Sequence, residues 1–174
     1  MKGCFTLLVI FISLLSYGQK KADEKDLPSN RAEFEQDYAT RIKKEYLYRT
    51  YIPKDINDAL DQLNKKLDDS AKMQFKSFTE EEVKIKGGLK MWIINNWGFS
   101  YGSRLSHLLK EMGIGHPEDM AEFLMITFHR SQLKEDLKIT EQIEYYKLKR
   151  KKMQEDRAKK SKLVKEEVVP RKGN

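Results

Sequence analysis

Cysteine is nearly absent from this chain of 174 residues: Cys4 is the only one, close to the N-terminus. The rest of the chain therefore has no disulfide and no thiol nucleophile. The three histidines are widely spaced, and neither an HExxH motif nor a histidine pair at helical spacing occurs. The sequence thus excludes thiol catalysis and favours a protein with no metal and no cofactor.

Long apolar runs are missing as well, apart from one near the N-terminus. Lys2 is followed by an apolar run over residues 5–15, and then by Ser16 and Gly18 at the −3 and −1 positions of a cleavage site. This pattern predicts a signal peptide over residues 1–18, with an uncleaved anchor as the alternative. No later run approaches the roughly 18 apolar residues that span a bilayer. We therefore expect an exported protein, periplasmic or secreted, with no transmembrane segment in the mature chain.

Charge is distributed unevenly. Residues 53–146 hold 13 Lys and Arg against 16 Asp and Glu, whereas residues 147–174 hold 12 against 4. The basic character therefore belongs to the C-terminal tail. This tail is either a solubilising extension or a segment that binds anionic surfaces. It contains no aromatic residue, so we do not expect base stacking or sequence-specific nucleic-acid binding.

Apolar residues recur at helical spacing through most of the chain, and no stretch longer than four residues alternates as a strand would. Heptads are not sustained. We predict an all-α fold: a compact, non-coiled-coil helix assembly with helical or disordered N- and C-terminal extensions. The expected parts are a signal peptide (1–18), a linker and amphipathic helix (19–50), a helical domain (51–146) and a basic charged tail (147–174).

Several helix starts are marked by capping residues or by a proline in the first turn. The positions are Asn30, Asp55, Thr79 with Glu82, Ser103 and Pro117. The first of these helices is expected to run to about Arg49.

Residues 87–104 (GGLKMWIINNWGFSYGSR) hold both tryptophans. The first half is apolar nearly all round and is expected to be the buried helix on which the others pack. The Gly87–Gly88 pair indicates either a closely packed neighbour or a fresh helix start at Gly88, and Gly98 is expected to end the helix. The second half, from Gly98 to Arg104, is then the candidate working surface.

Four short motifs stand together in the central part of the chain. They are IPKD and ALDQL within residues 52–63, MWI and NNWG within 91–98, GSRL at 102–105, and GI and HPEDM within 113–120. In combination they resemble a bacterial domain family of unknown function, a short helical module often found behind a signal peptide. The resemblance covers about residues 51–133. It implies a fold unit and an exported bacterial setting, and it brings no activity with it.

Arg104 is the first candidate ligand-binding residue, because a guanidinium beside a glycine-rich aromatic loop can clamp a carboxylate or phosphate. The alternative is a structural role, with Arg104 paired to Asp119 or to a carbonyl at a helix C-terminus. Trp97 and Tyr101 are candidates for a groove that binds sugar or peptide, although Trp97 is expected in the core first. His116 and Asp119 complete the set, and both also suit a helix start.

These features favour a non-catalytic exported module that binds a protein or an envelope component. One alternative is a hydrolase-like enzyme that acts on envelope polymer, with Arg104, His116 and Asp119 around a cleft. The other is an anionic-surface binder that acts through the basic tail.

Overall fold

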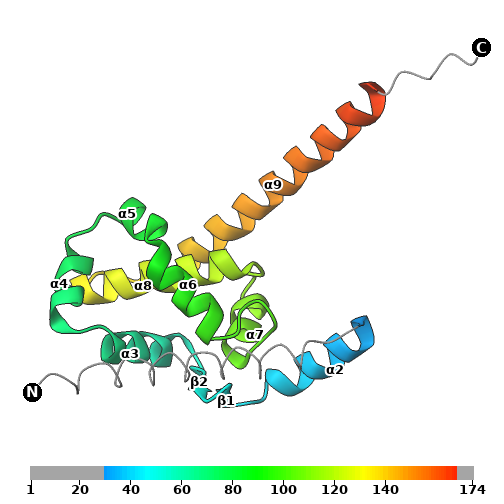
Figure 1. Ribbon diagram of the computed structural model, residues 1–174. Helices are drawn as coiled ribbons and strands as arrows, with labels where there is room; N and C mark the ends of the chain where they lie inside the picture. The colour runs from blue at the N-terminus through cyan, green and yellow to red at the C-terminus, as the bar shows by residue number, and fades with distance from the viewer. Residues whose placement is uncertain (1–29, 168–174) are drawn as a thin grey trace, which may run out of the picture. The chain divides into compact units, whose positions relative to one another are not determined.

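The computed structural model describes residues 30–167, and side chains on the last helix up to Ser161. The predicted signal peptide and most of the linker (1–29), and the end of the tail (168–174), lie outside the described residues. The described part contains eight helices and one two-stranded sheet, which confirms the all-α class. The elements are labelled in Figure 1: α2 (Arg31–Arg41), β1 (Tyr46–Leu47), β2 (Thr50–Tyr51), α3 (Ile56–Lys66), α4 (Asp69–Lys76), α5 (Glu80–Ile85), α6 (Gly87–Asn96), α7 (Arg104–Glu111), α8 (Pro117–Leu133) and α9 (Ile139–Glu167).

The chain divides into two compact units, Met1–Thr40 and Arg41–Asn174. The described part of the first unit is most of α2. Its start is capped as expected, because the backbone N–H of Glu33 donates to Asn30 Oδ1 at 3.0 Å. The second unit holds every other element.

The first helix is shorter than the sequence predicts. It ends at Arg41, and the chain then forms an antiparallel hairpin in which Leu47 lies opposite Thr50. Tyr48 and Arg49 turn the chain with positive φ angles of 48° and 64°. Positive φ at both central positions is typical of the tight two-residue turn that suits twisted strands. The prediction that this helix runs to about Arg49 was therefore wrong. Apolar residues keep a four-residue spacing beyond Arg41, but the chain there forms the hairpin.

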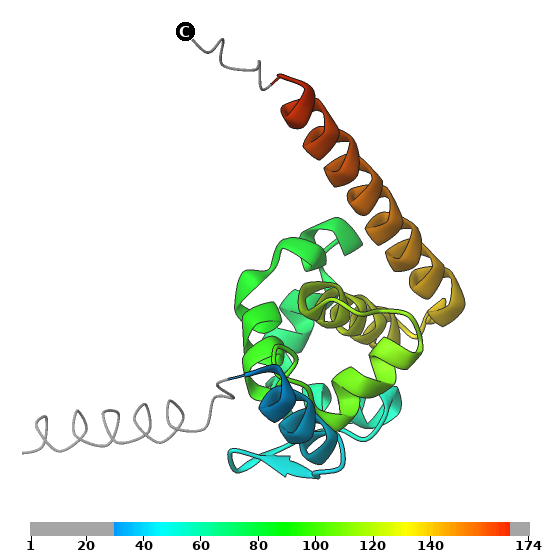
Figure 2. The ribbon, with the colours of Figure 1, turned by 90° about the vertical axis from the view of Figure 1, so that its right-hand side faces the viewer.

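Helix α8 is the buried centre of the second unit. Every residue from 119 to 129 is buried. Helices α3, α4, α5, α6, α7 and α9 all contact it. Figure 2 shows α8 surrounded by the other helices of this unit. The assignment of the central role to α6 was wrong: α6 buries Ile93 and Ile94 but leaves Met91 52% exposed.

Local capping follows the sequence prediction closely. Asp55 accepts from the backbone N–H of Asp58 at 2.9 Å, and Thr79 forms a reciprocal capping box with Glu82. Ser103 caps α7 through Ser106, and Pro117 is the first residue of α8. Each of these bonds satisfies a backbone donor that the first turn of a helix leaves without a partner.

The glycine pair starts a new helix. Gly87 is the first residue of α6, and a Cβ added at Gly87 or Gly88 would meet nothing within 4 Å. The alternative of a closely packed neighbour was therefore wrong. Gly98 has a φ of +66° directly after α6, as expected for a glycine that ends a helix.

The two glycine environments predict opposite effects of the same substitution. Gly98→Ala should lower the free energy of unfolding by about 1–2 kcal/mol, because its left-handed φ is strained for alanine and its Cβ would lie 3.2 Å from Leu47 Cδ1. Gly88→Ala should raise it by about 0.5 kcal/mol, because alanine fits a helix and restricts the unfolded chain. Urea denaturation of both variants measures the difference. Equal effects of the two substitutions would contradict the assigned helix end.

Candidate functional site

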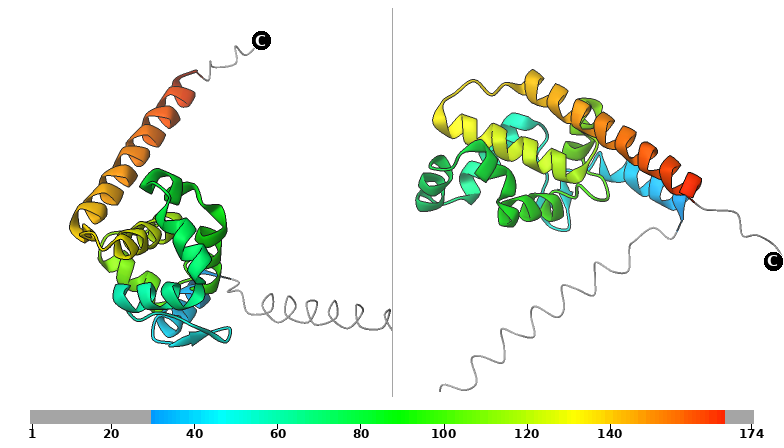
Figure 3. Two further views of the ribbon diagram at one scale, coloured as in Figure 1. Left: turned by 90° about the vertical axis from the view of Figure 1, so that its left-hand side faces the viewer. Right: turned by 90° about the horizontal axis from the view of Figure 1, so that it is seen from above.

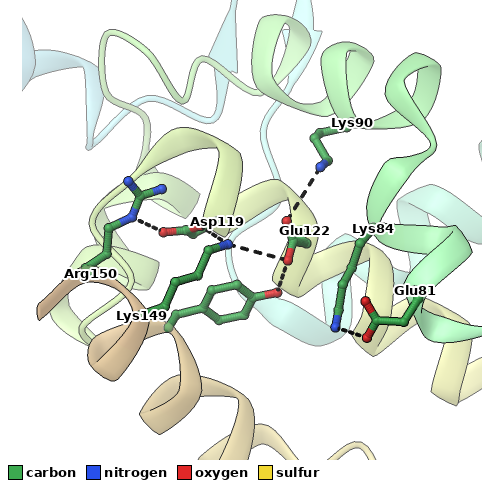
Figure 4. Close-up of polar contacts among 8 residues, drawn as sticks. Glu81, Lys84, Lys90, Asp119, Glu122, Lys149 and Arg150 are labelled. Carbon is green, nitrogen blue, oxygen red and sulfur yellow. Dashed lines mark hydrogen bonds and ion pairs between the residues drawn. The ribbon is translucent and has the colours of Figure 1, made fainter. Parts of the chain in front are cut away.

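A cluster of charged side chains joins the first turns of α8 to the first half of α9 (Figure 4). We call it the charged cluster; its members are Lys90, Asp119, Glu122, Tyr146, Lys149 and Arg150. It includes one residue of the sequence-predicted site, Asp119.

Asp119 is buried, with its side chain 2% exposed. Lys149 Nζ donates to Asp119 Oδ1 at 2.9 Å, and Arg150 Nε donates to Oδ2. Burial on its own would raise the pKa of Asp119. The hydrogen bonds from Arg150 and Lys149 outweigh it and hold that pKa below its ordinary value. Asp119 is therefore held as a carboxylate between two cations.

Glu122 lies one helical turn beyond Asp119, on the same side of α8. The Tyr146 hydroxyl donates to Glu122 Oε1 at 3.2 Å, and Lys149 Nζ lies 3.7 Å from the same oxygen. Lys90 Nζ of α6 approaches Oε2 at 3.5 Å. Burial of Tyr146, and then the nearby Glu122 carboxylate, raises the pKa of this tyrosine. Lys149 thus links both acids, and Glu122 also connects α6 to α9.

Helical spacing explains why these residues meet. Tyr146, Lys149 and Arg150 are separated by three and four positions, so they lie on one side of α9, as Asp119 and Glu122 do on α8. Asp119 also lies in the first turn of α8, where the helix dipole favours a negative charge. The sequence alone missed the cluster because Lys149 and Arg150 were counted with the charged tail. The only signal was their spacing from Tyr146.

The cluster holds two helices together through ion pairs. Both oxygens of Asp119 and both oxygens of Glu122 have a cation or a hydroxyl within reach. The oxygens of both carboxylates are therefore engaged with partners inside the protein. Within residues 30–167, no group of three or more His, Cys, Asp and Glu is placed to hold a metal ion.

Arg104, the first residue of α7, contacts the hairpin strand β2 and the residue after it. Its Nε donates to the backbone carbonyl oxygen of Ile52 at 2.8 Å, and its guanidinium carbon lies 5.1 Å from the centre of the Tyr51 ring. The Tyr51 hydroxyl in turn donates to Asp58 at 2.7 Å. Arg104 therefore connects α7 to the chain before α3. Its carbonyl partner follows a strand and not a helix, and Asp119 pairs with Lys149 and Arg150 instead.

The aromatic candidates lie in different environments. Trp97 is 1% exposed, with the rings of Trp92 and Phe99 centred 5.7 Å and 6.4 Å from its own. Tyr101 is 44% exposed in the loop before α7. Trp97 consequently has almost no surface to offer a ligand, and Tyr101 has a substantial one.

His116 is exposed at the N-terminus of α8 and makes no side-chain capping bond. Among the described residues, no hydrogen bond or ion pair joins Arg104, His116 and Asp119 to one another. The structure brings Asp119 to α9, and it brings Arg104 to the hairpin.

A cavity of about 200 Å³ lies between α5, α8 and α9, and Tyr146 of the charged cluster forms part of its wall. Its walls include Glu80, Lys84, Arg130 and Tyr145. Arg130 forms ion pairs with Glu80, which also lines the cavity, and with Glu135. These two acids neutralise the charge of Arg130. This cavity shares α8 and α9 with the charged cluster.

Residues 52–132 match the family model described as Domain of unknown function (DUF6794). Over this segment the chain is similar to that family. The match confirms the resemblance to a domain family of unknown function and agrees with its predicted extent. The segment contains Asp119 and Glu122, whereas Tyr146, Lys149 and Arg150 of α9 lie beyond it. No curated protein and no solved structure matches the chain.

Proposed function

We propose that this protein is an exported, non-catalytic binding module of the bacterial cell envelope. In this proposal the domain that matches DUF6794 supports the second half of α9, which forms an exposed helical arm. The observation that carries the proposal is the contrast along α9. Its first half is fastened to α8 by Tyr146, Lys149 and Arg150. Every side chain from Lys151 to Ser161 is exposed. Figures 1 and 3 show the second half of α9 extending beyond the domain.

The arm is long enough to reach a partner away from the domain. Helix α9 continues to Glu167, which is about 25 Å beyond Arg150 at 1.5 Å per residue. A polar helix without tertiary contacts is only marginally stable in water. The docked half of α9 is already helical, so the exposed half extends an existing helix and does not have to nucleate one. The domain therefore stabilises the arm.

The alternative of an envelope hydrolase requires Arg104, His116 and Asp119 around one cleft. Lys149 and Arg150 cover Asp119, and Arg104 is engaged with Ile52 and Tyr51. We therefore favour the binding module. The export part of the proposal rests on residues 1–18, as argued from the sequence. In residues 30–167, none of the helices is both long and apolar enough to cross a membrane.

The test compares three forms of the protein with isolated envelope fragments in a co-sedimentation assay. The mature chain from Gln19 should sediment with the fragments, and a chain ending at Arg150 should not. Arg104→Ala should behave like the mature chain, because Arg104 faces the hairpin. Thermal denaturation checks that the shortened chain keeps its domain folded. Equal sedimentation with and without the arm would overturn the assignment to α9.

Export is tested separately by N-terminal sequencing of the protein recovered from outside the cytoplasm. The expected first residue is Gln19. Recovery of the protein only from the cytoplasm, with Met1 retained, would contradict the proposed location.

A further inference from the structure

The exposed arm carries more positive charge than its acids balance. We use the term arm for residues 151–161, the part of α9 beyond the charged cluster whose side chains are described. It holds five cations (Lys151, Lys152, Arg157, Lys159 and Lys160) and two acids, Glu155 and Asp156. All seven are exposed, and none forms an ion pair with any described residue. These cations are therefore available to a partner.

The two acids lie on one side of the helix. Lys152 and Lys159 are each three or four positions from both Glu155 and Asp156, so they share a side with them. Arg157 has Met153, Gln154, Lys160 and Ser161 at the same spacings, and none of these is acidic. The side of the arm around Arg157 consequently has a more positive potential than the side around Lys152 and Lys159.

The composition of the arm argues against a protein groove and against nucleic acid. The buried centres of protein interfaces are rich in aromatic residues and poor in lysine. The arm has four lysines and no aromatic residue, and Met153, 37% exposed, is its only large apolar side chain. The lack of aromatics also removes the stacking on which binding to single-stranded nucleic acid depends. A partner that needs only negative charge spread over a surface fits better.

We infer that the arm binds an anionic lipid surface through its exposed cations, among which Arg157 has no acid three or four positions away. Clusters of four to eight Lys and Arg on a helix are attracted to anionic headgroups. This inference rests on the proposed binding module and names the partner of its arm.

The charge of the rest of the molecule supports this partner. Residues 53–146 carry 13 Lys and Arg against 16 Asp and Glu, so an anionic surface repels the domain weakly while it attracts the arm. The sequence after the arm adds Lys162 and Lys165 on the same helix. Figure 2 shows the distal part of α9 clear of the other helices of the unit.

The experiment measures co-sedimentation of the full mature chain with phosphatidylcholine vesicles, with and without phosphatidylglycerol. Binding should require phosphatidylglycerol, and it should disappear at about 1 M salt, where charges are screened within about 3 Å. Arg157→Gln with Lys160→Gln should weaken binding about 30-fold, as expected for the loss of two cations at the surface. The matched pair Lys152→Gln with Lys159→Gln removes the same charge and should weaken binding less. Both lysines have Glu155 and Asp156 at helical spacing, whereas Lys160 has only Asp156 and Arg157 has neither. Glu155→Gln with Asp156→Gln should strengthen it.

Four results would overturn the inference. Equal binding to neutral vesicles would show that the lipid charge is not recognised. Equal losses in the two cation pairs would contradict the larger contribution assigned to the pair with fewer acidic neighbours. A mature chain that sediments with envelope fragments but not with phosphatidylglycerol vesicles would leave the binding module intact and remove the lipid surface as its partner. If the fragments then release an acidic protein that retains the mature chain, the partner is that protein. Failure to bind either fragments or vesicles would remove both proposals together. All variants should melt at the wild-type temperature, because the substituted side chains are exposed.

Discussion

Trp97→Ala should lower the free energy of unfolding by about 3–5 kcal/mol, the usual cost of removing a large aromatic side chain from a core. Trp97 is 1% exposed and packs against the rings of Trp92 and Phe99. It directly follows α6, and the helix cannot move in to fill the space because Gly98 reverses the chain there with a φ of +66°. The substitution should leave a cavity whose cost appears in urea denaturation as a lower midpoint with an unchanged slope.

Tyr101→Ala is the matched control for this prediction. Tyr101 belongs to the same aromatic stretch but is 44% exposed, so its removal should change the free energy of unfolding by no more than about 0.5 kcal/mol. A small effect at both positions would mean that Trp97 lies at a surface, as a binding groove would require. The pair therefore decides between the two roles that the sequence allows for Trp97.

Local interactions are the part of this fold that could be predicted from the sequence. The caps at Asp55, Thr79 and Ser103 each depend on a hydrogen bond to a residue three positions later. Such bonds need no information about the rest of the chain. The positive φ at Gly98 was predictable for the same reason, because only its own turn requires it.

The position of each helix in the unit could not be predicted in this way. Helices α6 and α8 both contain long apolar stretches, and the sequence favoured α6. Helix α8 also buries Asp119, Glu122 and His129, which a search for an apolar stripe excludes. Two of these are buried only because cations from α6 and α9 neutralise them. The ring of the third, His129, packs edge-on against that of Phe75 of α4.

The candidate site was predicted in part, for a related reason. Asp119 was selected because of its helix-start motif, and its partners lie 30 and 31 positions further along the chain. In the sequence, Lys149 and Arg150 were assigned to the basic tail because of its net positive charge. The exposed residues that follow them have a similar composition, so charge alone could not separate the docked half of α9 from the arm.

Asp119→Asn should lower the free energy of unfolding by about 2–3 kcal/mol. Removal of one partner from a fully buried ion pair costs about 3–5 kcal/mol, because it leaves the other charge buried without compensation. The cost should be smaller here, because the side chains of Lys149 and Arg150 are 31% and 27% exposed and can turn toward water. Hydrogen exchange should show the loss first in the backbone of α9 before Arg150. The control is Asp156→Asn, which removes an exposed acid of α9. It should change the free energy of unfolding by less than about 0.5 kcal/mol.

The pH dependence of this difference tests whether charge is its cause. The pKa of Asp119 is held below its ordinary value of 3.8, so its ion pairs stabilise the fold fully above that pH. Their contribution is then lost as the pH falls through the lowered value. Burial on its own would lower the pKa of Lys149, but the hydrogen bond that Lys149 donates to Asp119 and the charge of that carboxylate raise this pKa above 10.5. The contribution of Lys149 is complete below 10.5 and is lost as the pH rises through the raised value. The wild type should therefore exceed Asp119→Asn by a constant amount between these limits, and the two should converge at lower pH. A difference that persists unchanged well below the ordinary pKa would mean that packing around Asp119, and not its charge, holds α9 to the domain.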